Sequence, residues 1–528
     1  MDDDDKISLL PEHVKHRILS FIPSIKEVVR TSSLSKSWLR TWRSFQVTDF
    51  DQSLILPDSA IHQFVGARRW NEYSESFVRF VDDALMRSCD GMPRFQVLAT
   101  AEMAPHVDKW VGMALDYHVE ELSINICKVE NFPGNLLYSI PKRVLSAEFI
   151  KSLTLSGDVK FDGISTVSLP SLRSLGLSHS HIDNQMFQRL LGCCPFLEDL
   201  TVGSCSLLSE IEVSNLSFLS RVMVMASCWP ELQVVRIEAP ALESFRCYSP
   251  YLLKQDIGLI VRLSPSLRCL EFRDLFKMDD WFCQFLSKFP MLESLSLGRC
   301  RLLKRITISN PLLKNLSITN CDNLVDIRID TPKLSSFDYE ALSTLPSIWT
   351  ENPPYNCAVG LYFRSPRIQA PSACFQELQK FLTEWSTTFG CFELTVHLYE
   401  WDEGMMGEIN KKLDLSTPGI QHLKLVFDAS QLSYPLILDS ILSNCRPTTI
   451  LLRVTKPLLK FICEALANRE ENPECCPGKV QCWKHELKGA KIERVQGTQH
   501  HGPLDWQIML SLLPTLSTWT EVCFRLQW

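Results

Sequence analysis

Residues 290–300 read PMLESLSLGRC, and similar stretches recur along the chain. Three clear copies are PSLRSLGLSHS from Pro170, PFLEDLTVGSC from Pro195 and PLLKNLSITNC from Pro311. When all copies are aligned, they start at residues 170, 195, 217, 240, 265, 290, 311 and 332, so that successive copies lie 21 to 25 residues apart. One short unit is therefore repeated, and the repetition predicts a stack of similar structural units.

Apolar residues recur at fixed positions of this unit, which we number from Pro290 so that Leu292 occupies position 3. Position 6 is leucine, valine or phenylalanine in every copy, and position 3 is always leucine. The position-3 residues are Leu172, Leu197, Leu219, Leu242, Leu267, Leu292, Leu313 and Leu334. A period in the twenties with the pattern L-x-x-L-x-L is typical of leucine-rich repeats.

Positions 6 and 8, such as Leu295 and Leu297, alternate with polar residues and predict a strand with one face turned inward. A single unit cannot bury these leucines, whereas parallel strands of stacked units can. The predicted fold class is therefore α/β, with a leucine-rich-repeat solenoid whose parallel strands line the concave face.

The segments between the strands differ in length and pattern. NQMFQRLLGCC before Pro195 and DDWFCQFLSKF before Pro290 have helical periodicity, whereas the 21-residue units, such as the one containing CDNLVDIRID, predict a second short strand. Degenerate units are predicted at HVEELSINI (118–126), at FIKSLTLSG (149–157) and from Pro418. The helices are thus expected to cover only part of the solenoid.

The composition excludes several classes of protein. The 528 residues are 45% hydrophobic and 22% charged, which is enough to bury a large core, and no apolar run is long enough for a membrane-spanning helix. A net charge of −7 without a dense Lys/Arg block argues against a nucleic-acid partner. The twenty cysteines are scattered and follow no signal peptide, so we expect reduced thiols and a cytoplasmic or nuclear location.

The sequence contains no convincing catalytic or metal-binding motif. The G-x-S-x-G, H-E-x-x-H and phosphate-loop patterns are absent, so no catalytic residue, cofactor or enzymatic activity is predicted. The best metal candidate is CCPGKVQCWKH, which contains Cys475, Cys476, Cys482 and His485. Because adjacent cysteines rarely bind one tetrahedral ion together, we predict no metal there.

The first fifty residues break the repeat and predict three short helices. Pro11 and Glu12 suit a helix start, Pro23 ends that helix, and further helices fit residues 25–32 and 34–45. So small a unit buries little surface on its own. It could cap the solenoid, or it could leave apolar side chains for a partner.

LPEHVKHRILSFIP and VVRTSSLSKSWLRTW resemble a plant-type F-box, with Ser37 where that family usually has arginine. VDKWVGMALDYHVEELSI resembles the first repeats of plant F-box/LRR-repeat proteins, and CWKHELKGAKIERVQG resembles the FBD-type region at their C-terminal end. We accordingly expect an F-box at 7–50, a linker with the first helical or degenerate units at 51–116, the solenoid at 117–345, an irregular loop at 346–370, and a degenerate repeat or FBD-like region at 371–528.

The resemblance implies a substrate-recognition subunit of an SCF-type ubiquitin ligase. Such a subunit is not itself an enzyme: its F-box docks a Skp-type adaptor, which connects it to cullin and RING subunits, and its repeats bind an unidentified target protein. The implied F-box core and adaptor contacts, which the sequence alone does not separate, are Leu10, Pro11, Ile18, Leu19, Ile22, Val28, Leu34 and Trp38.

Two other functions stay open. The chain could be a co-receptor for a small molecule or hormone, or a non-ligase scaffold of leucine-rich repeats. A basic cluster on the concave face would favour the co-receptor, and the sequence indicates no such cluster. Binding of a Skp-type adaptor would distinguish the ligase subunit from the scaffold.

Overall fold

A computed structural model describes most of residues 7–364, with gaps at 53–66, 88–91, 128–135, 249–255, 342–345 and a few shorter stretches. Beyond residue 364 it describes 393–399, 422–427, 446–467, 487–495, 519–528 and the single residues 442, 509 and 512. The chain divides into two units. Unit 1 comprises Met1–Leu242 and Pro250–Ser264, and unit 2 comprises Glu243–Ser249 and Pro265–Trp528.

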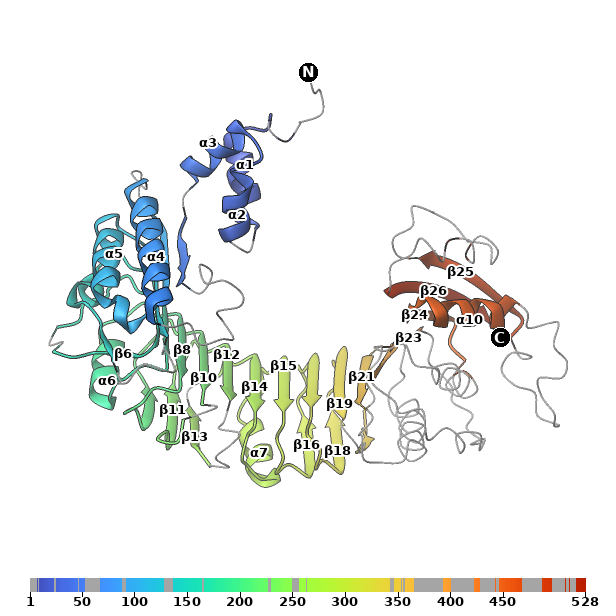
Figure 1. Cartoon of the computed structure of the whole chain (residues 1–528). Helices are drawn as coiled ribbons and strands as arrows, with labels where there is room; N and C mark the ends of the chain where they lie inside the picture. Colours follow the sequence, from blue (N-terminus) through green and yellow to red (C-terminus); the bar gives the residue numbers. More distant parts are fainter. Residues whose placement is uncertain are drawn as a thin grey trace, which may run out of the picture. The chain divides into compact units, whose positions relative to one another are not determined.

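Unit 1 begins with three short helices: α1 (Glu12–Ser20), α2 (Ile25–Thr31) and α3 (Lys36–Ser44) (Figure 1). Pro11 stands at the N-cap of α1, where its missing N–H costs no helical hydrogen bond. The side chain of Ser35 caps α3 by accepting a hydrogen bond from the backbone N–H of Trp38 at 3.2 Å. The three helices predicted from the sequence are thus confirmed, with ends shifted by one or two residues.

Parallel strands form the main sheet of unit 1. In spatial order they are β1 (Asp49–Asp51), β2 (Arg94–Thr100), β3 (Glu121–Cys127), β5 (Ser152–Gly157), β7 (Ser174–Ser178), β8 (Asp199–Gly203) and β10 (Arg221–Met225). Its helices are α4 (Ala67–Arg87), α5 (Ala104–Asp116) and α6 (Asn184–Gly192), with short 3-10 turns at Ala101–Met103 and Lys142–Ser146. Strands β1 and β2 lie within residues 49–116, where the sequence analysis placed the end of the F-box, a linker and the first degenerate units.

Smaller sheets of unit 1 lie on the return segments of the repeats. One holds the parallel strands β9 (Glu210–Val213), β11 (Val234–Glu238) and β13 (Gly258–Arg262), and another pairs β4 (Tyr138–Ser139) with β6 (Val159–Lys160). A return segment thus forms either a helix, as at α6, or a short strand.

Unit 2 continues the same construction, and its parallel strands lie in a row in Figure 1. The parallel strands, in spatial order, are β12 (Ser244–Tyr248), β14 (Cys269–Arg273), β15 (Ser294–Gly298), β17 (Asn315–Thr319), β19 (Ser336–Ala341), β21 (Ala358–Arg364), β22 (Glu393–Tyr399), β23 (His422–Phe427) and β24 (Thr449–Thr455). Beyond β24 the sheet is no longer purely parallel. The strand β26 (Trp519–Gln527) pairs with β24 on one side and with β25 (Gly489–Val495) on the other, antiparallel to both.

The return segments of unit 2 contain both predicted alternatives. α7 (Asp279–Leu286) is the helix predicted before Pro290, and the second short strands are β16 (Arg305–Ser309), β18 (Asp326–Asp330) and β20 (Ser347–Trp349). A further helix, α10 (Lys456–Ala467), follows β24. The 21-residue units have room only for a strand, as their length predicted.

The predicted core positions are confirmed. Each repeat strand begins at position 5, and the position-3 leucines from Leu172 to Leu334 are buried with at most 1% exposure. Positions 6 and 8 are buried in every repeat strand from β7 to β19. Positions 5, 7 and 9 point to the opposite, outward face of the sheet because side chains alternate along a strand.

A left-handed residue follows several of the strands at position 10. His179, Ser204, Asp274, Arg299 and Asn320 have φ between 41° and 55°. None of these five is glycine, so residue type did not indicate the turn. Tertiary packing imposes this left-handed conformation, because the chain must turn at the end of the strand in each of these units.

Residues 346–370 were expected to form an irregular loop, and for two segments this is wrong. β20 pairs with β18 and β21 pairs with β19, both in parallel. Val359 and Leu361 of β21 are buried. The proline-rich sequence between the two strands concealed the repeat, because it favours a loop, whereas the alternation of buried residues that marks a strand resumes only at Ala358.

Candidate interaction surfaces

The three N-terminal helices bury part of the predicted residue set. Leu19, Val28 and Trp38, one from each helix, are 1%, 2% and 5% exposed. Side chains so buried inside the unit hold the helices together and are not accessible to a second protein. They are the core members of the set.

The other predicted residues are accessible. Leu34 is 69% exposed and Ile18 is 36% exposed. Pro11 is also exposed, whereas Leu10 and Ile22 are half-buried. These side chains remain available for contact with a partner.

Sequence reasoning missed two of the most exposed apolar side chains in this region. Leu9 is 84% exposed and Phe21, which directly follows α1, is 74% exposed. Phe21 could have been found, because it lies three residues after Ile18 and therefore on the same side of a helix. Exposed apolar side chains gathered on so small a unit are typical of a protein-binding surface.

Ser37, the residue at which this chain departs from the F-box pattern, accepts a hydrogen bond from a buried lysine. Lys15 is 5% exposed, and its Nζ donates a hydrogen bond to Ser37 Oγ at 2.6 Å. The same Nζ lies 6.0 Å from the centre of the Trp38 ring, within range of a cation–π contact. Lys15 and Ser37 therefore join α1 to α3.

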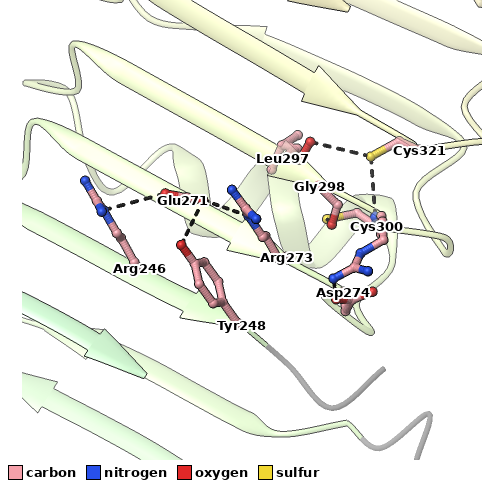
Figure 2. A network of polar contacts seen from close by, with 10 residues as sticks. Arg246, Tyr248, Glu271, Arg273, Asp274, Leu297, Gly298, Cys300 and Cys321 are labelled. Carbon is pink, nitrogen blue, oxygen red and sulfur yellow. Dashed lines mark hydrogen bonds and ion pairs between the residues drawn. The ribbon is translucent and has the colours of Figure 1, made fainter. Parts of the chain in front are cut away.

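A second candidate surface lies on the outward face of the sheet in unit 2, where side chains of β12 and β14 meet (Figure 2). The carboxylate of Glu271 is only 13% exposed and accepts a hydrogen bond from Tyr248 Oη at 3.1 Å. Its Oε1 lies 2.9 Å from Arg273 Nε, and its Oε2 lies 3.5 Å from Arg246 Nε. One carboxylate thus holds two guanidinium groups and a phenol.

A second carboxylate lies in the turn after β14. Arg299 Nη2 is 2.8 Å from Asp274 Oδ2, and the Asp274 side chain is 5% exposed. Burial raises the pKa of the Asp274 carboxyl, although Arg299 opposes this effect. The other carboxylate oxygen, Oδ1, is buried and has no hydrogen-bond partner among the described residues.

The sequence indicated no basic cluster on this face, and sequence reasoning did not anticipate that three ion-paired arginines lie there. Arg246, Arg273 and Arg299 come from three successive repeats and are separated by more than 25 residues along the chain. They occupy positions 7, 9 and 10, and stacking of the repeats brings them together. Aligning the repeats by position would have indicated that the three arginines lie near one another. A search for consecutive basic residues could not find them.

A Ser–His–Asp grouping in unit 1 does not have the geometry of a catalytic triad. Ser206 Oγ lies 2.7 Å from His181 Nδ1, but His181 Nε2 is 3.9 Å from Asp158 Oδ1. That second separation is too long for a hydrogen bond, so Asp158 does not fix the imidazole as a triad aspartate would. The grouping therefore provides no activated serine.

The cysteines at position 11 are buried inside the repeats. Cys205, Cys300 and Cys321 are at most 1% exposed, and the Cys300 N–H donates a hydrogen bond to Cys321 Sγ at 3.3 Å. Burial raises the pKa of the Cys205 thiol to about 11, which disfavours the thiolate that a metal requires. Within the part of the chain that the structure describes, no cluster of three potential metal ligands occurs.

Cys475, Cys476, Cys482 and His485 lie outside the described residues, so the absence of a metal there stays a prediction. We expect the purified full chain to contain no stoichiometric zinc, which elemental analysis would measure. One zinc per chain, lost in a Cys482→Ser variant, would contradict this prediction.

Comparison with protein families identifies two domains. An F-box domain matches residues 7–50, and the family described as "At1g61320/AtMIF1, LRR domain" matches residues 92–263 and 258–350. The first match covers the three helices, and the second covers most of the repeats described above.

Curated relatives come from Arabidopsis thaliana. F-box/LRR-repeat protein At3g58930 is 31% identical over 37% of this chain and 40% of its own length. F-box/FBD/LRR-repeat protein At4g26340 is 31% identical over 38% and 43%, and putative F-box/LRR-repeat protein At4g00320 is 26% identical over 58% and 57%. The chain therefore spans less than two thirds of each of these relatives.

A leucine-rich repeat protein from Bacteroides ovatus is similar in structure over 57% of this chain and 86% of its own, at 12% sequence identity and a TM-score of 0.18. So low a TM-score supports no argument about function. Among the helices of the described ranges, none combines the length and apolar character needed to cross a bilayer.

Proposed function

We propose that this chain, in which an F-box domain precedes a leucine-rich-repeat domain, is the substrate-recognition subunit of an SCF-type ubiquitin ligase acting in the cytoplasm or nucleus. The observation that supports this proposal most is the exposed apolar surface of the F-box helices. Leu34 and Phe21 expose most of their side chains to water, which is unfavourable unless a partner covers them. A Skp-type adaptor is the partner that an F-box domain generally binds.

In this proposal the chain carries out no chemistry itself. The adaptor connects the F-box to cullin and RING subunits, while the outward face of the repeats holds a target protein. Ubiquitin transfer is then accelerated by proximity, because a lysine of the bound target stays near the activated ubiquitin carrier at a high effective concentration.

The accessible members of the predicted set are the proposed adaptor contacts. These are Leu10, Pro11, Ile18, Ile22 and Leu34, to which the exposure of Leu9 and Phe21 adds two further candidates. Leu19, Val28 and Trp38 are assigned to the F-box core instead, because the helices already bury them. Their replacement would unfold the F-box before it could report on an interface.

The double change Leu10→Ala with Pro11→Ala tests the proposal. We expect adaptor affinity to fall at least about thirtyfold, which corresponds to about 2 kcal/mol for the loss of an interface anchor. Pull-down of a purified Skp-type adaptor by the full chain would measure the effect. A thermal melt should show that the repeats remain folded, since neither residue contributes to them.

Met291→Ala is a matched control, because Met291 is an apolar residue of the repeats that is 45% exposed. It should leave adaptor binding unchanged. If the wild-type chain binds no adaptor, or if the double variant binds equally well, the ligase proposal is wrong and a non-ligase scaffold takes its place. A small-molecule co-receptor would also bind the adaptor, so ligand binding to the repeats has to be tested separately.

A further inference from the structure

We propose that Arg246 and Arg273 form a docking site for an acidic side chain, aspartate or glutamate, on a segment of a bound protein. This inference specifies the chemistry of the target that the proposed function assigns to the repeats, and it rests on that function only for the identity of the target as a ligase substrate. The site lies wholly within unit 2, on the outward face of β12 and β14 (Figure 2).

The orientation of the two arginines leaves their terminal amino groups available. Both guanidinium groups meet Glu271 through Nε, at 2.9 Å for Arg273 and 3.5 Å for Arg246. Their side chains are 52% and 43% exposed. Apart from Glu271, neither arginine has a hydrogen-bond or ion-pair partner among the described residues, so their terminal amino groups can bind the two oxygens of a further carboxylate.

The site is also pre-organised. Glu271 holds both arginines, and the Arg273 guanidinium lies over the Tyr248 ring, 5.0 Å from its centre. Tyr248 is in turn held by its hydrogen bond to Glu271. Because these contacts already restrict the long arginine side chains, a ligand loses less conformational entropy on binding them.

The residues of β15 that lie beside Glu271 and Arg273 are small. In the sheet register Glu271 lies next to Ser296 of β15, and Arg273 lies next to Gly298. A Cβ atom on Gly298 would stand 3.2 Å from Cγ of Arg273, which is tighter than ordinary contact. The glycine therefore allows Arg273 to lie where it does, and β15 presents only short side chains at these two places.

The charge balance differs from that of the ion pairs at position 4 of the repeats. There, Arg268 and Lys314 flank Glu293 at 3.1 Å and 2.7 Å and lower the pKa of its carboxyl, with Lys314 contributing most. On the outward face Arg246 and Arg273 share one carboxylate, so the group carries a net charge of +1. Arg299 and Asp274 nearby form a further ion pair, and the Asp274 carboxylate also interacts electrostatically with Arg273. A single carboxylate would neutralise the cluster, in a chain whose overall charge of −7 otherwise repels acidic ligands.

The test is binding of a short fluorescein-labelled peptide in which glutamate alternates with glycine, followed by fluorescence anisotropy on the full chain at low ionic strength. We expect the double variant Arg246→Gln with Arg273→Gln to bind it at least about tenfold more weakly, because two charge-assisted hydrogen-bonding groups are lost. The matched control is Arg268→Gln, which removes an arginine of similar exposure that is already paired with Glu293.

Affinity that falls in the double variant and not in the control supports the site. The proposal is overturned if the glutamate peptide does not bind, if both variants bind alike, or if the corresponding glutamine peptide binds as tightly. It is also overturned if only a phosphoserine peptide binds, since the site would then not recognise carboxylates. Adaptor pull-down on the same variants keeps the two proposals apart, because loss of peptide binding with normal adaptor binding rejects this site alone.

Discussion

Replacing Leu292 by alanine is expected to lower the free energy of unfolding by about 2–5 kcal/mol, as truncation of a fully buried leucine generally does. Leu292 is 0% exposed and lies at position 3, where every repeat from residue 170 to 334 places a buried leucine. Adjacent units stack, so the cavity left by the substitution would border more than one repeat. Local relaxation could therefore fill little of it.

Chemical denaturation of the full chain, followed by circular dichroism, would measure this loss. The adjacent residue provides the control, because Met291 is 45% exposed and its change to alanine should alter the free energy of unfolding by no more than about 0.5 kcal/mol. Equal effects of the two substitutions would show that position 3 does not face the core.

A second large effect is expected at Gly157, where alanine should cost about 2–4 kcal/mol through backbone strain and steric clash together. The residue adopts φ of 85°, which side chains other than glycine rarely tolerate. An added Cβ would stand 1.9 Å from the carbonyl oxygen of Ile126 on the neighbouring strand β3. Because that oxygen belongs to the backbone of a paired strand, it cannot move aside without loss of sheet hydrogen bonds.

Gly163→Ala separates the two contributions. Gly163 also has a positive φ, of 64°, but an added Cβ would meet no atom within 4 Å. The substitution should therefore show the strain alone, about 1 kcal/mol. Thermal melts of both variants would measure the difference, and a Gly157 variant no less stable than the Gly163 variant would contradict the close approach of β5 to β3.

The repeat strands were predictable because their information is local and periodic. Leu292 and Leu295 recur at the same spacing in every unit, and a strand with one buried face is the structure that satisfies this pattern. The helix at α7 and the second strand at β18 followed from the same reasoning, since segment length decides which of the two can fit. The antiparallel pairing of β26 with β24 and β25 was not predicted, because it joins segments that no repeat relates.

The F-box illustrates a different limit. The pattern that predicted three helices does not distinguish Leu19, which is buried, from Leu34, which is exposed, since both are leucines in amphipathic segments. The angle at which one helix crosses another decides which side each leucine faces, and that angle depends on packing between residues far apart in the chain. Lys15 shows the same limit, because burial of a lysine is not expected from its residue type.

The sequence by itself determined the α/β repeat architecture, the F-box and the leucines that fill the core, because each depends on residues within one unit. Only the tertiary structure decided that Arg246, Arg273 and Tyr248 surround Glu271, because Arg246 and Tyr248 belong to one repeat and Glu271 and Arg273 to the next. Their proximity depends on the parallel register of β12 and β14, which places Arg246 opposite Glu271 and Tyr248 opposite Arg273. The core leucines recur because every unit must fill the same interior space between its neighbours. Outward residues are under no such constraint, and which of them interact is decided only when the strands pair.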